Sequence, residues 1–325
     1  MSLWSRSAFV ICACGAALHA QSGSGSGVPP IELLAPTVLK FPASVRALGM
    51  GDVGVASRDD DVIFYNPAQL AIARGMSASG SRYSPTAGGG ALSSVTRFNN
   101  GGIGVGVSML EYNALTPLLP GTPPSTEGHG GTASSIDAVI GLAQVYKSLR
   151  VGVAAKYVDD QLPDVRINQA AFDVGLAKDF RRFYTVGLAV QNIGGSTTYP
   201  CPSCAIALSN VSPSPSLSVR AKLPLRATLG AATSRQLGPF DAVATFGLSM
   251  LRSDLLHPAG GVELAYSWLD GYNIAVRAGS ASPSVGQSGA TGGVGFTMDR
   301  LTIDYGAEAS WSGRGVQHRI GLRVR

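Results

Sequence analysis

The sequence has few charged residues, and it has no long apolar run after its first twenty residues. Charged residues make up 14% of the 325-residue chain and hydrophobic residues make up 45%, whereas soluble domains average about 25% charged residues. A membrane-spanning helix needs about 20 consecutive apolar residues, so helical spans are excluded. The 42 glycines argue against long helices, because an interior glycine costs about 1 kcal/mol relative to alanine. The apolar residues are therefore expected to alternate along β-strands.

The sequence is also poor in groups that carry out chemistry. It contains 4 cysteines and 4 histidines, and the histidines after residue 20 (His129, His257 and His318) are scattered, so no metal cluster is predicted. It has no Gly-x-Ser-x-Gly motif of a nucleophilic serine, and we predict a non-enzymatic protein without a cofactor. The net charge of +5 comes from basic residues interspersed with acidic ones, which argues against a nucleic-acid partner.

Residues 1–20 have the features of a secretory signal peptide. Arg6 supplies a positive charge, residues 8–18 form an apolar region, and Leu18-His19-Ala20 precedes the expected cleavage site. The alternative, a lipoprotein signal around Cys12, has a poor consensus. Residues 21–30 (QSGSGSGVPP) are expected to form a flexible linker.

From residue 74 onward the chain divides into segments with period-two alternation, which is typical of outer-membrane barrel strands. Residues 184–191 place Tyr, Val, Leu and Val on one face and Thr, Gly, Ala and Gln on the other. The polar faces are mostly Gly, Ala, Ser and Thr, which suits a confined lumen better than the water-facing surface of a soluble sandwich. We therefore predict an all-β protein whose residues 74–325 form a 14-stranded antiparallel transmembrane β-barrel, with strands at 75–84, 91–98, 102–112, 135–147, 151–159, 168–179, 184–194, 222–235, 240–250, 259–268, 272–280, 288–298, 301–311 and 316–325.

Short turns and longer loops alternate along this predicted barrel, and residues 113–134 and 195–221 form the longest loops. Outer-membrane barrels have short periplasmic turns and long extracellular loops. We therefore expect the long loops outside the cell, and an even strand count places both chain ends in the periplasm. Aromatic residues near strand ends predict two interfacial girdles, although aromatics also favour strands in general: Tyr146, Phe180, Phe183, Tyr184, Phe240, Trp268 and Tyr272 by the turns, and Tyr83, Tyr112, Tyr157 and Trp311 by the loops.

Residues 44–73 interrupt the strand pattern. They contain Arg46-Ala47-Leu48-Gly49-Met50-Gly51, the acidic run Asp59-Asp60-Asp61, and Tyr65-Asn66-Pro67-Ala68. This segment resembles the N-terminal segment of the PorV/PorQ family, relatives of the FadL-like (OMPP1/FadL/TodX) outer-membrane transporters. The resemblance implies that residues 46–73 fold into the lumen as a hatch, with residues 21–45 as the linker and the start of that hatch.

Asn66 and Pro67 have a physical interpretation of their own, because Asn caps helices and Pro favours the first helical position. They predict a short helix from Pro67 to Ala73. The candidate hatch motif consists of Arg46, Gly49, Gly51, Asp60, Tyr65, Asn66, Pro67 and Ala68. The glycines of residues 49–54 are expected to let the hatch backbone pack against the barrel wall. The alternative is a periplasmic tail in which the cap lies at the surface and the aspartates are solvated.

The predicted lumen carries charges of both signs: Lys156, Arg226, Arg277, Arg319 and Arg323 against Asp173, Glu263, Asp304 and Glu308. They fit either a salt-bridged filling that anchors the hatch or a polar permeation path. We expect the aspartates of the hatch to pair with lumen arginines such as Arg277 or Arg319. Cys201 and Cys204 are candidates for a small disulfide in an exported loop, and a redox-active pair is the alternative.

The resemblance implies two functions. One is a gated conduit for small hydrophobic solutes. The other, as in PorV, is a secretion-system-associated barrel that binds or shuttles exported proteins at the cell surface. The expected location is the bacterial outer membrane, and the expected partners are its lipid, the barrel-assembly machinery during biogenesis, and a hydrophobic small molecule or an exported protein. A continuous apolar tunnel would favour the conduit, whereas a plugged lumen without a lateral opening would favour the secretion partner.

Overall fold

A computed structural model describes residues 31–41, 43–114, 131–161, 166–180, 183–200, 218–252, 256–282, 289–309 and 316–325. The predicted signal peptide, the linker, Trp311 and the pair Cys201 and Cys204 lie outside these residues. No helix in the described part of the chain is both long and apolar enough to cross a membrane.

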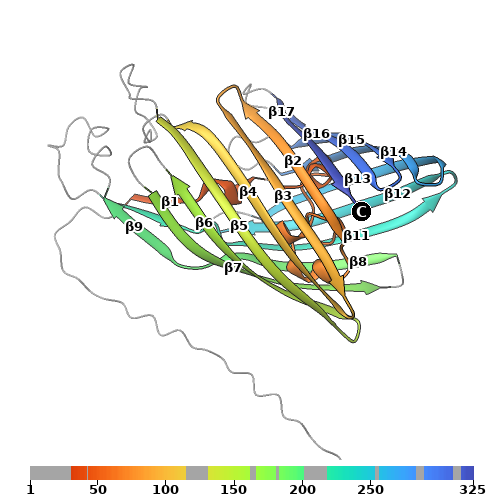
Figure 1. The fold of residues 1–325 in the computed structure, drawn as a ribbon, viewed down its shortest axis with the longest axis horizontal. Helices are drawn as coiled ribbons and strands as arrows, with labels where there is room; N and C mark the ends of the chain where they lie inside the picture. The colour runs from red at the N-terminus through yellow and green to blue at the C-terminus, as the bar shows by residue number, and fades with distance from the viewer. Residues whose placement is uncertain are drawn as a thin grey trace, which may run out of the picture.

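The main body is a closed antiparallel barrel of fourteen strands (Figure 1), which confirms the predicted fold. Each strand pairs with its neighbour in sequence, β8 pairs with β11, and β17 closes the barrel on β2. The barrel strands are β2 (Gly75–Ser84), β3 (Ala87–Phe98), β4 (Gly101–Ala114), β5 (Gly131–Tyr146), β6 (Leu149–Gln161), β7 (Arg166–Phe180), β8 (Tyr184–Ile193), β11 (Arg226–Leu237), β12 (Phe240–Leu251), β13 (Leu256–Leu269), β14 (Tyr272–Ala281), β15 (Ala290–Met298), β16 (Leu301–Ala309) and β17 (Val316–Val324).

The predicted strands correspond one to one with the barrel strands, but several boundaries differ. The strand expected at 222–235 begins at Arg226, and the strand expected at 135–147 begins at Gly131. The predicted loop 195–221 is not entirely a loop. It contains β9 (Ser196–Pro200) and β10 (Ser218–Lys222), which form a three-stranded sheet with β1 (Ile31–Leu34). Period-two alternation within one strand could not indicate this sheet, because its strands are short and β1 comes from a distant part of the chain.

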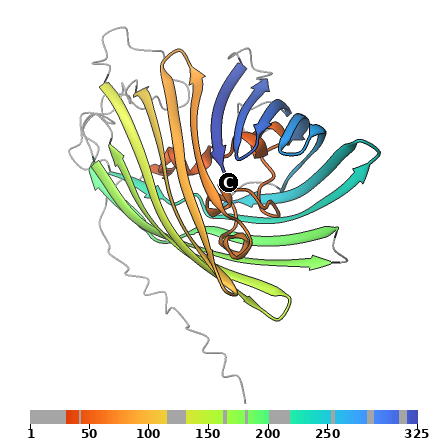
Figure 2. The same cartoon turned by 45° about the vertical axis from the view of Figure 1, so that its right-hand side comes forward.

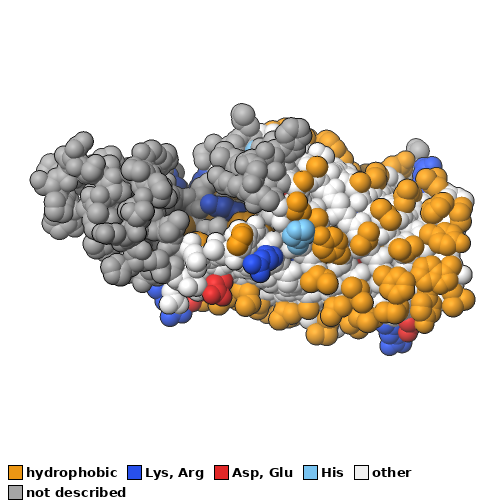
Figure 3. Space-filling view, turned by 90° about the horizontal axis from the view of Figure 1, so that it is seen from above, with side chains coloured by type: hydrophobic (Ala, Val, Ile, Leu, Met, Phe, Trp, Pro, Cys, Tyr) orange, Lys and Arg blue, Asp and Glu red, His pale blue; other side chains and the backbone are white. Residues whose placement is uncertain are grey.

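The outer wall is apolar between its two ends. In β6 and β7 nearly every second residue is exposed while its neighbours are buried, and the exposed positions are mostly large apolar residues. The face seen in Figure 3 is apolar or uncharged over most of its area, with charged side chains near its two ends. At the end with the short turns, which we call the turn end, Lys147, Lys178 and Arg235 lie over the rings of Tyr146, Phe180 and Phe183. The opposite end is called the loop end.

The predicted turn-end aromatics are exposed on the outer wall, and so is Tyr157 at the loop end. The prediction was wrong for Tyr83 and Tyr112, which pack inside the barrel against Leu39 and Phe41. Tyr83 lies at a register shift between Arg82 and Ser84, whereas Tyr112 lies on the same face of the regular strand β4 as buried Leu110.

The N-terminal segment threads the lumen from one end to the other (Figures 1 and 2). β1 runs parallel to β10, which leads into β11 at the loop end. The chain then passes through η1 (Thr37–Lys40), α1 (Val45–Gly49), η2 (Val62–Phe64) and η3 (Pro67–Ala71), and it enters β2 at the turn end beside Val324 of β17. The start of β2 and the end of β17 thus lie together at the turn end, as an even strand count requires, while Ile31, the first described residue, lies at the loop end. The predicted position of the N-terminus itself lies outside the described residues.

Candidate functional site: the hatch inside the lumen

Two short helical turns shape the hatch, and each has a side-chain cap. The Ser44 hydroxyl accepts a hydrogen bond from the backbone N–H of Ala47 and starts α1. Asn66 caps η3 by accepting from the N–H of Ala68 at 3.0 Å, and Pro67 follows it. This confirms the predicted Asn-Pro cap, although the element is a 3-10 helix that ends at Ala71 rather than a helix extending to Ala73. The Asn66 amide also donates to the carbonyl groups of Val55 and Leu176, which ties the cap to the wall.

Tyr65 connects the two halves of the hatch. Its hydroxyl donates to Asp52 at 2.6 Å and accepts from the backbone N–H groups of Ala43 and Ser44. The ring packs on Gly54, where a Cβ atom would lie 2.4 Å from the ring. Any larger residue at position 54 would therefore displace the tyrosine.

Gly51 brings the hatch backbone against the barrel wall. Its φ of +76° is in the left-handed region, and a Cβ atom there would lie 2.6 Å from the carbonyl oxygen of Ser280. Glycine removes both the conformational penalty and the clash. The Gly-Met-Gly sequence thus acts through close backbone approach, as the pattern of glycines in residues 49–54 had indicated.

An apolar core joins the second half of the hatch to one side of the lumen. Val62, Ile63 and Leu70 are fully buried against wall residues such as Val95 and Val139. Glycines in the wall make room for them: a Cβ atom at Gly104 would lie 2.6 Å from the Leu70 side chain. This core holds the hatch against β3–β6.

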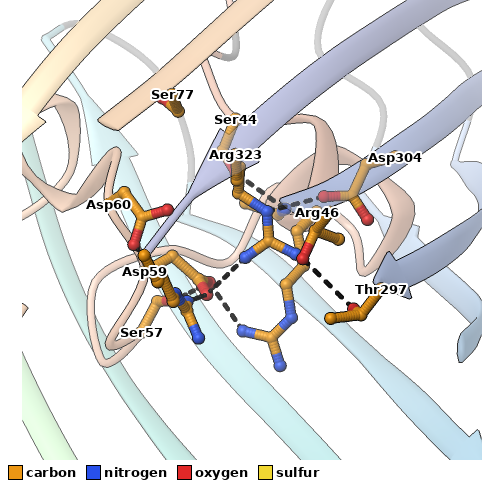
Figure 4. A network of polar contacts seen from close by, with 12 residues as sticks. Ser44, Arg46, Ser57, Asp59, Asp60, Ser77, Thr297, Asp304 and Arg323 are labelled. Carbon is orange, nitrogen blue, oxygen red and sulfur yellow. Dashed lines mark hydrogen bonds and ion pairs between the residues drawn. The ribbon is translucent and has the colours of Figure 1, made fainter. Parts of the chain in front are cut away.

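Ion pairs hold the hatch to the opposite side at the turn end. Asp59 pairs with Arg46 of the hatch at 2.6 Å and with Arg323 and Arg325 of the wall at 3.1 and 2.9 Å. Figure 4 shows Asp59 next to the Arg323 guanidinium, with Asp304 on the other side of that arginine. We call the connected set of ion pairs the latch: Arg46, Asp59, Asp60, Glu263, Arg277, Asp304, Arg323 and Arg325.

The latch continues through the wall across neighbouring strands. Arg46 donates to both oxygens of Glu263, at 2.8 and 2.7 Å, and Arg277 donates to Glu263 and Asp304. The expectation that hatch aspartates pair with lumen arginines is confirmed by Asp59 and Arg323, but neither of the two arginines named as examples is the partner. Arg277 is occupied by Glu263 and Asp304, whereas Arg319 donates to Ser81 and Tyr83. The latch borders a cavity of about 390 Å³ that is also lined by Arg58, Asp299 and Arg300.

The three hatch aspartates differ in their electrostatics. Burial opposes ionisation of Asp59, but Arg46, Arg323 and Arg325 outweigh it and hold the pKa well below its usual range. Burial raises the pKa of Asp60 against the attraction of Arg325. Burial, together with the neighbouring Asp59 carboxylate, raises the pKa of Asp61 to about 6. Asp59 is therefore the charged centre of the latch.

A second polar cluster lies in the lumen farther from the turn end, at an irregularity between β7 and β8. The Lys156 ammonium pairs with Asp173 at 2.9 Å and donates to the Asn192 side chain, and Asp173 accepts from the Asn192 backbone N–H. Asn192 has φ of +59°, as β-bulges allow. Of the other predicted lumen charges, Arg226, Glu308 and Arg319 form no ion pair with any residue that the structure describes.

The loop end of the lumen contains a cluster of apolar and aromatic groups, among them Tyr83 and Tyr112, which had been expected at the membrane interface. Val38, Leu110 and Val158 are buried there. Phe41 and Tyr83 pack with ring centroids 4.4 Å apart. Charged groups border this cluster, because Asp160 is buried near Lys40 and Arg319 lies over the Tyr83 ring. The lumen thus has an apolar cluster at the loop end and an ion-pair network at the turn end.

Within the described residues, no group of three or more His, Cys, Asp or Glu side chains could hold a metal ion. His318 lies on the outer wall beside Tyr305, away from the lumen acids. The described lumen contains ion pairs and packed apolar groups, and no residue set that points to a particular cofactor.

Comparisons with known proteins agree with this architecture. No protein-family model matches the chain, and no curated protein matches it in sequence. The fold is similar to the Ralstonia pickettii toluene transporter TbuX, with a TM-score of 0.56 and 14% identity over 89% of this chain and 99% of that one. It is also similar to the CymD monoaromatic hydrocarbon channel, with a TM-score of 0.53 and 10% identity over 89% of this chain and 97% of that one. A TodX mutant, also a monoaromatic hydrocarbon channel, has a TM-score of 0.56 at 13% identity over 86% of this chain and 97% of that one. At these identities the similarity shows the barrel fold alone, and the resemblance to the PorV/PorQ family and to FadL-like transporters remains a prediction.

Proposed function

We propose that the protein is an outer-membrane conduit for small hydrophobic solutes, gated by the hatch. The observation that carries the proposal is the polarity of the lumen along its axis. A solute that enters at the loop end meets Val38, Phe41, Tyr83 and Tyr112. At the turn end the hatch and its latch fill the cross-section. Passage then requires part of the hatch to move.

The latch is suited to reversible opening. Ion pairs lose strength when water reaches them, because the Coulomb energy falls as the effective dielectric constant rises. Movement of Asp59 by a few ångströms would leave Arg323 still paired with Asp304, and Arg46 still paired with Glu263. The apolar core around Leu70, in contrast, resists displacement. We therefore place the moving part in α1 and the segment that joins it to η2, which carry Arg46 and Asp59.

A cysteine cross-link tests this proposal. A Cβ atom at Gly321 would lie 2.7 Å from Cγ2 of Val45, so a Val45→Cys and Gly321→Cys pair is positioned to form a disulfide between α1 and the wall. In a background with Cys201→Ser and Cys204→Ser, toluene uptake by cells should fall when the disulfide forms and recover after reduction. Val45→Cys alone is the control and should not respond to reductant. Equal uptake by the cross-linked and reduced proteins would contradict gating by the hatch.

The location is tested separately. A barrel with an apolar outer wall satisfies its backbone hydrogen bonds in lipid only because it is closed, so we expect fractionation with the outer membrane, resistance to carbonate extraction and heat-modifiable migration on gels. Recovery as a soluble protein would contradict the location. Cysteine labelling on intact cells should modify position 121 and not position 271.

A second candidate function is a membrane partner for exported proteins. The continuous pairing of all fourteen strands around a filled lumen favours it, because no gap between strands offers a lateral exit in the described wall. It predicts that mild-detergent extracts contain a stoichiometric exported protein bound to the barrel. Toluene uptake would then be unaffected by the Val45–Gly321 cross-link.

A further inference from the structure

The outer wall carries a concave apolar groove on the sector formed by β17, β2, β3, β4, β5 and β6. It has a volume of about 920 Å³. Small and larger residues alternate along its lining: Ala78 lies between its larger partners Leu322 and Leu92 and forms a low floor on β2, and Ser94, Ala138 and Ala155 lie among Met76, Val107, Ile140 and Tyr157. Since barrel walls are generally convex outward, a groove of this size on the membrane-facing surface is a specific feature.

The groove continues toward the loop end along a row of glycines. Ala78 pairs with Leu92, and the next outward pair is Gly80 with Gly90. A Cβ atom at Gly80 would meet nothing within 4 Å, so the space outside the wall is empty at this position. Ile320 on β17 and Met109 on β4, both exposed, flank this row.

The row ends at two basic side chains. The next outward pair on β17 and β2 is His318 with Arg82, and both are exposed. The Tyr305 hydroxyl contacts Nδ1 of His318 at 2.7 Å, which leaves Nε2 facing outward, and Arg82 makes one long hydrogen bond, to the Pro85 carbonyl at 3.3 Å. The outward residues level with Arg82 on the next three strands are Gly88, Glu111 and Ser134, none of which is apolar. Arg82 therefore lies at the outer boundary of the apolar belt of the wall.

We propose that this groove binds a membrane lipid that carries a phosphate, with an acyl chain on the Ala78 floor and the phosphate on Arg82 and His318. The charge complementarity selects the occupant, because the apolar channel ends at cationic groups at the depth of lipid headgroups. Arginine recognises phosphate through paired N–H donors. The proposal requires the barrel to lie in a membrane, and it does not depend on whether solutes pass through the lumen.

The acidic residue Glu111 tests whether a negatively charged group binds next to Arg82. Arg82 on β2 pairs with Gly88 on β3, and Gly88 pairs with Glu111 on β4. Glu111 therefore lies level with Arg82, two strands away. Its carboxylate repels a phosphate on Arg82, so the phosphate should lie on the β17 side. Removing this charge should therefore tighten binding.

Native mass spectrometry of the purified full-length protein in detergent tests the proposal, with phosphatidylglycerol as the probe and a galactosyl diacylglycerol of the same chains as the neutral lipid. Arg82→Gln should weaken phosphatidylglycerol binding about fivefold, the effect expected of one basic residue near a lipid headgroup, and should leave binding of the neutral lipid unchanged. Ala78→Phe should weaken binding of both lipids, and Glu111→Gln should strengthen phosphatidylglycerol binding.

Two controls match these variants elsewhere on the wall. Lys178→Gln removes an outward cation at the turn end, and Ala244→Phe enlarges an outward small residue on β12; neither should change binding. Equal loss in Lys178→Gln and Arg82→Gln would show general surface attraction and overturn the site, as would unchanged binding in Arg82→Gln. Inorganic phosphate at the lipid concentration should not compete, and competition would show that the acyl chain is not held. A dimer that dissociates in Ala78→Phe would assign the groove to a second copy of the chain and overturn the lipid.

Discussion

The two ends of the lumen are closed by different chemistry. At the turn end, buried charges of opposite sign hold the hatch to β13–β17 through the latch. At the loop end, aromatic and aliphatic groups around Phe41 pack without any ion pair among them. Charged pairs depend steeply on both partners being present, whereas apolar contacts lose stability in proportion to the area removed. The comparison predicts that single changes release the turn end abruptly and loosen the loop end gradually.

The largest expected effect comes from Asp59→Asn. It removes the carboxylate that Arg46, Arg323 and Arg325 share, while Arg46 keeps Glu263 and Arg323 keeps Asp304. The cost should therefore lie at the lower end of the roughly 3 to 5 kcal/mol that breaking a buried pair costs. We expect hydrogen exchange of the hatch amides around α1 to accelerate strongly and single-channel conductance to rise. Asp241→Asn, which changes an exposed acid at the turn end, is the control and should change neither.

A slightly smaller effect is expected for Gly51→Val, which tests close approach rather than charge. The added side chain meets the Ser280 carbonyl and adopts an unfavourable φ, and the backbone strain alone costs about 1 to 3 kcal/mol. Gly238→Val has a similar φ of +61° with nothing nearby, so it isolates the strain. If both variants lower hatch protection equally, close packing of Gly51 on the wall does not matter.

The pH dependence of hatch stability should follow Asp61. Its pKa is raised to about 6 in the folded protein, so the folded state holds a proton that the unfolded state releases near pH 4. The contribution of Asp61 to the free energy of unfolding is therefore greatest below pH 4. About 3 kcal/mol of that contribution is lost as the pH rises through 6. Asp59 acts oppositely, but only below its usual range, where its stabilisation is lost as the pH falls. Hydrogen exchange between pH 4 and 7 should show this loss, and Asp61→Asn should abolish it.

The smallest effect is expected for Phe41→Ala at the loop end. Phe41 is half-buried and its ring packs at a tilt against that of Tyr83, so its removal should cost about 1 to 2 kcal/mol. Protease sensitivity should increase around η1 while amides of α1 and η2 remain protected. Release of the turn end by this variant would show that the two closures are coupled and would remove the contrast between them.

Much of the fold was predictable because its signals are local. Alternation identified all fourteen strands, since a wall between lipid and a packed lumen forces each residue to one side. Asn66-Pro67 predicted a capped turn, and the glycines of residues 49–54 predicted close packing, because each depends on the residue's own backbone preferences. The mixed lumen charges predicted ion pairs between neighbouring strands, as found for Glu263 with Arg277.

What only the tertiary structure decided involves partners far apart in sequence. Asp59 pairs with Arg323 and Arg325 because β17 closes the barrel beside the end of the hatch, and no local pattern ranks these arginines above Arg277 or Arg319. Tyr83 points inward where β2 shifts register, and it meets Phe41 of the hatch beside Tyr112, which faces inward with Leu110 on β4. The pairing of β1 with β10 sets the direction in which the hatch threads the lumen. The sequence by itself determined the faces of each strand, because side-chain alternation is intrinsic to extended backbone, whereas barrel closure decided which faces meet.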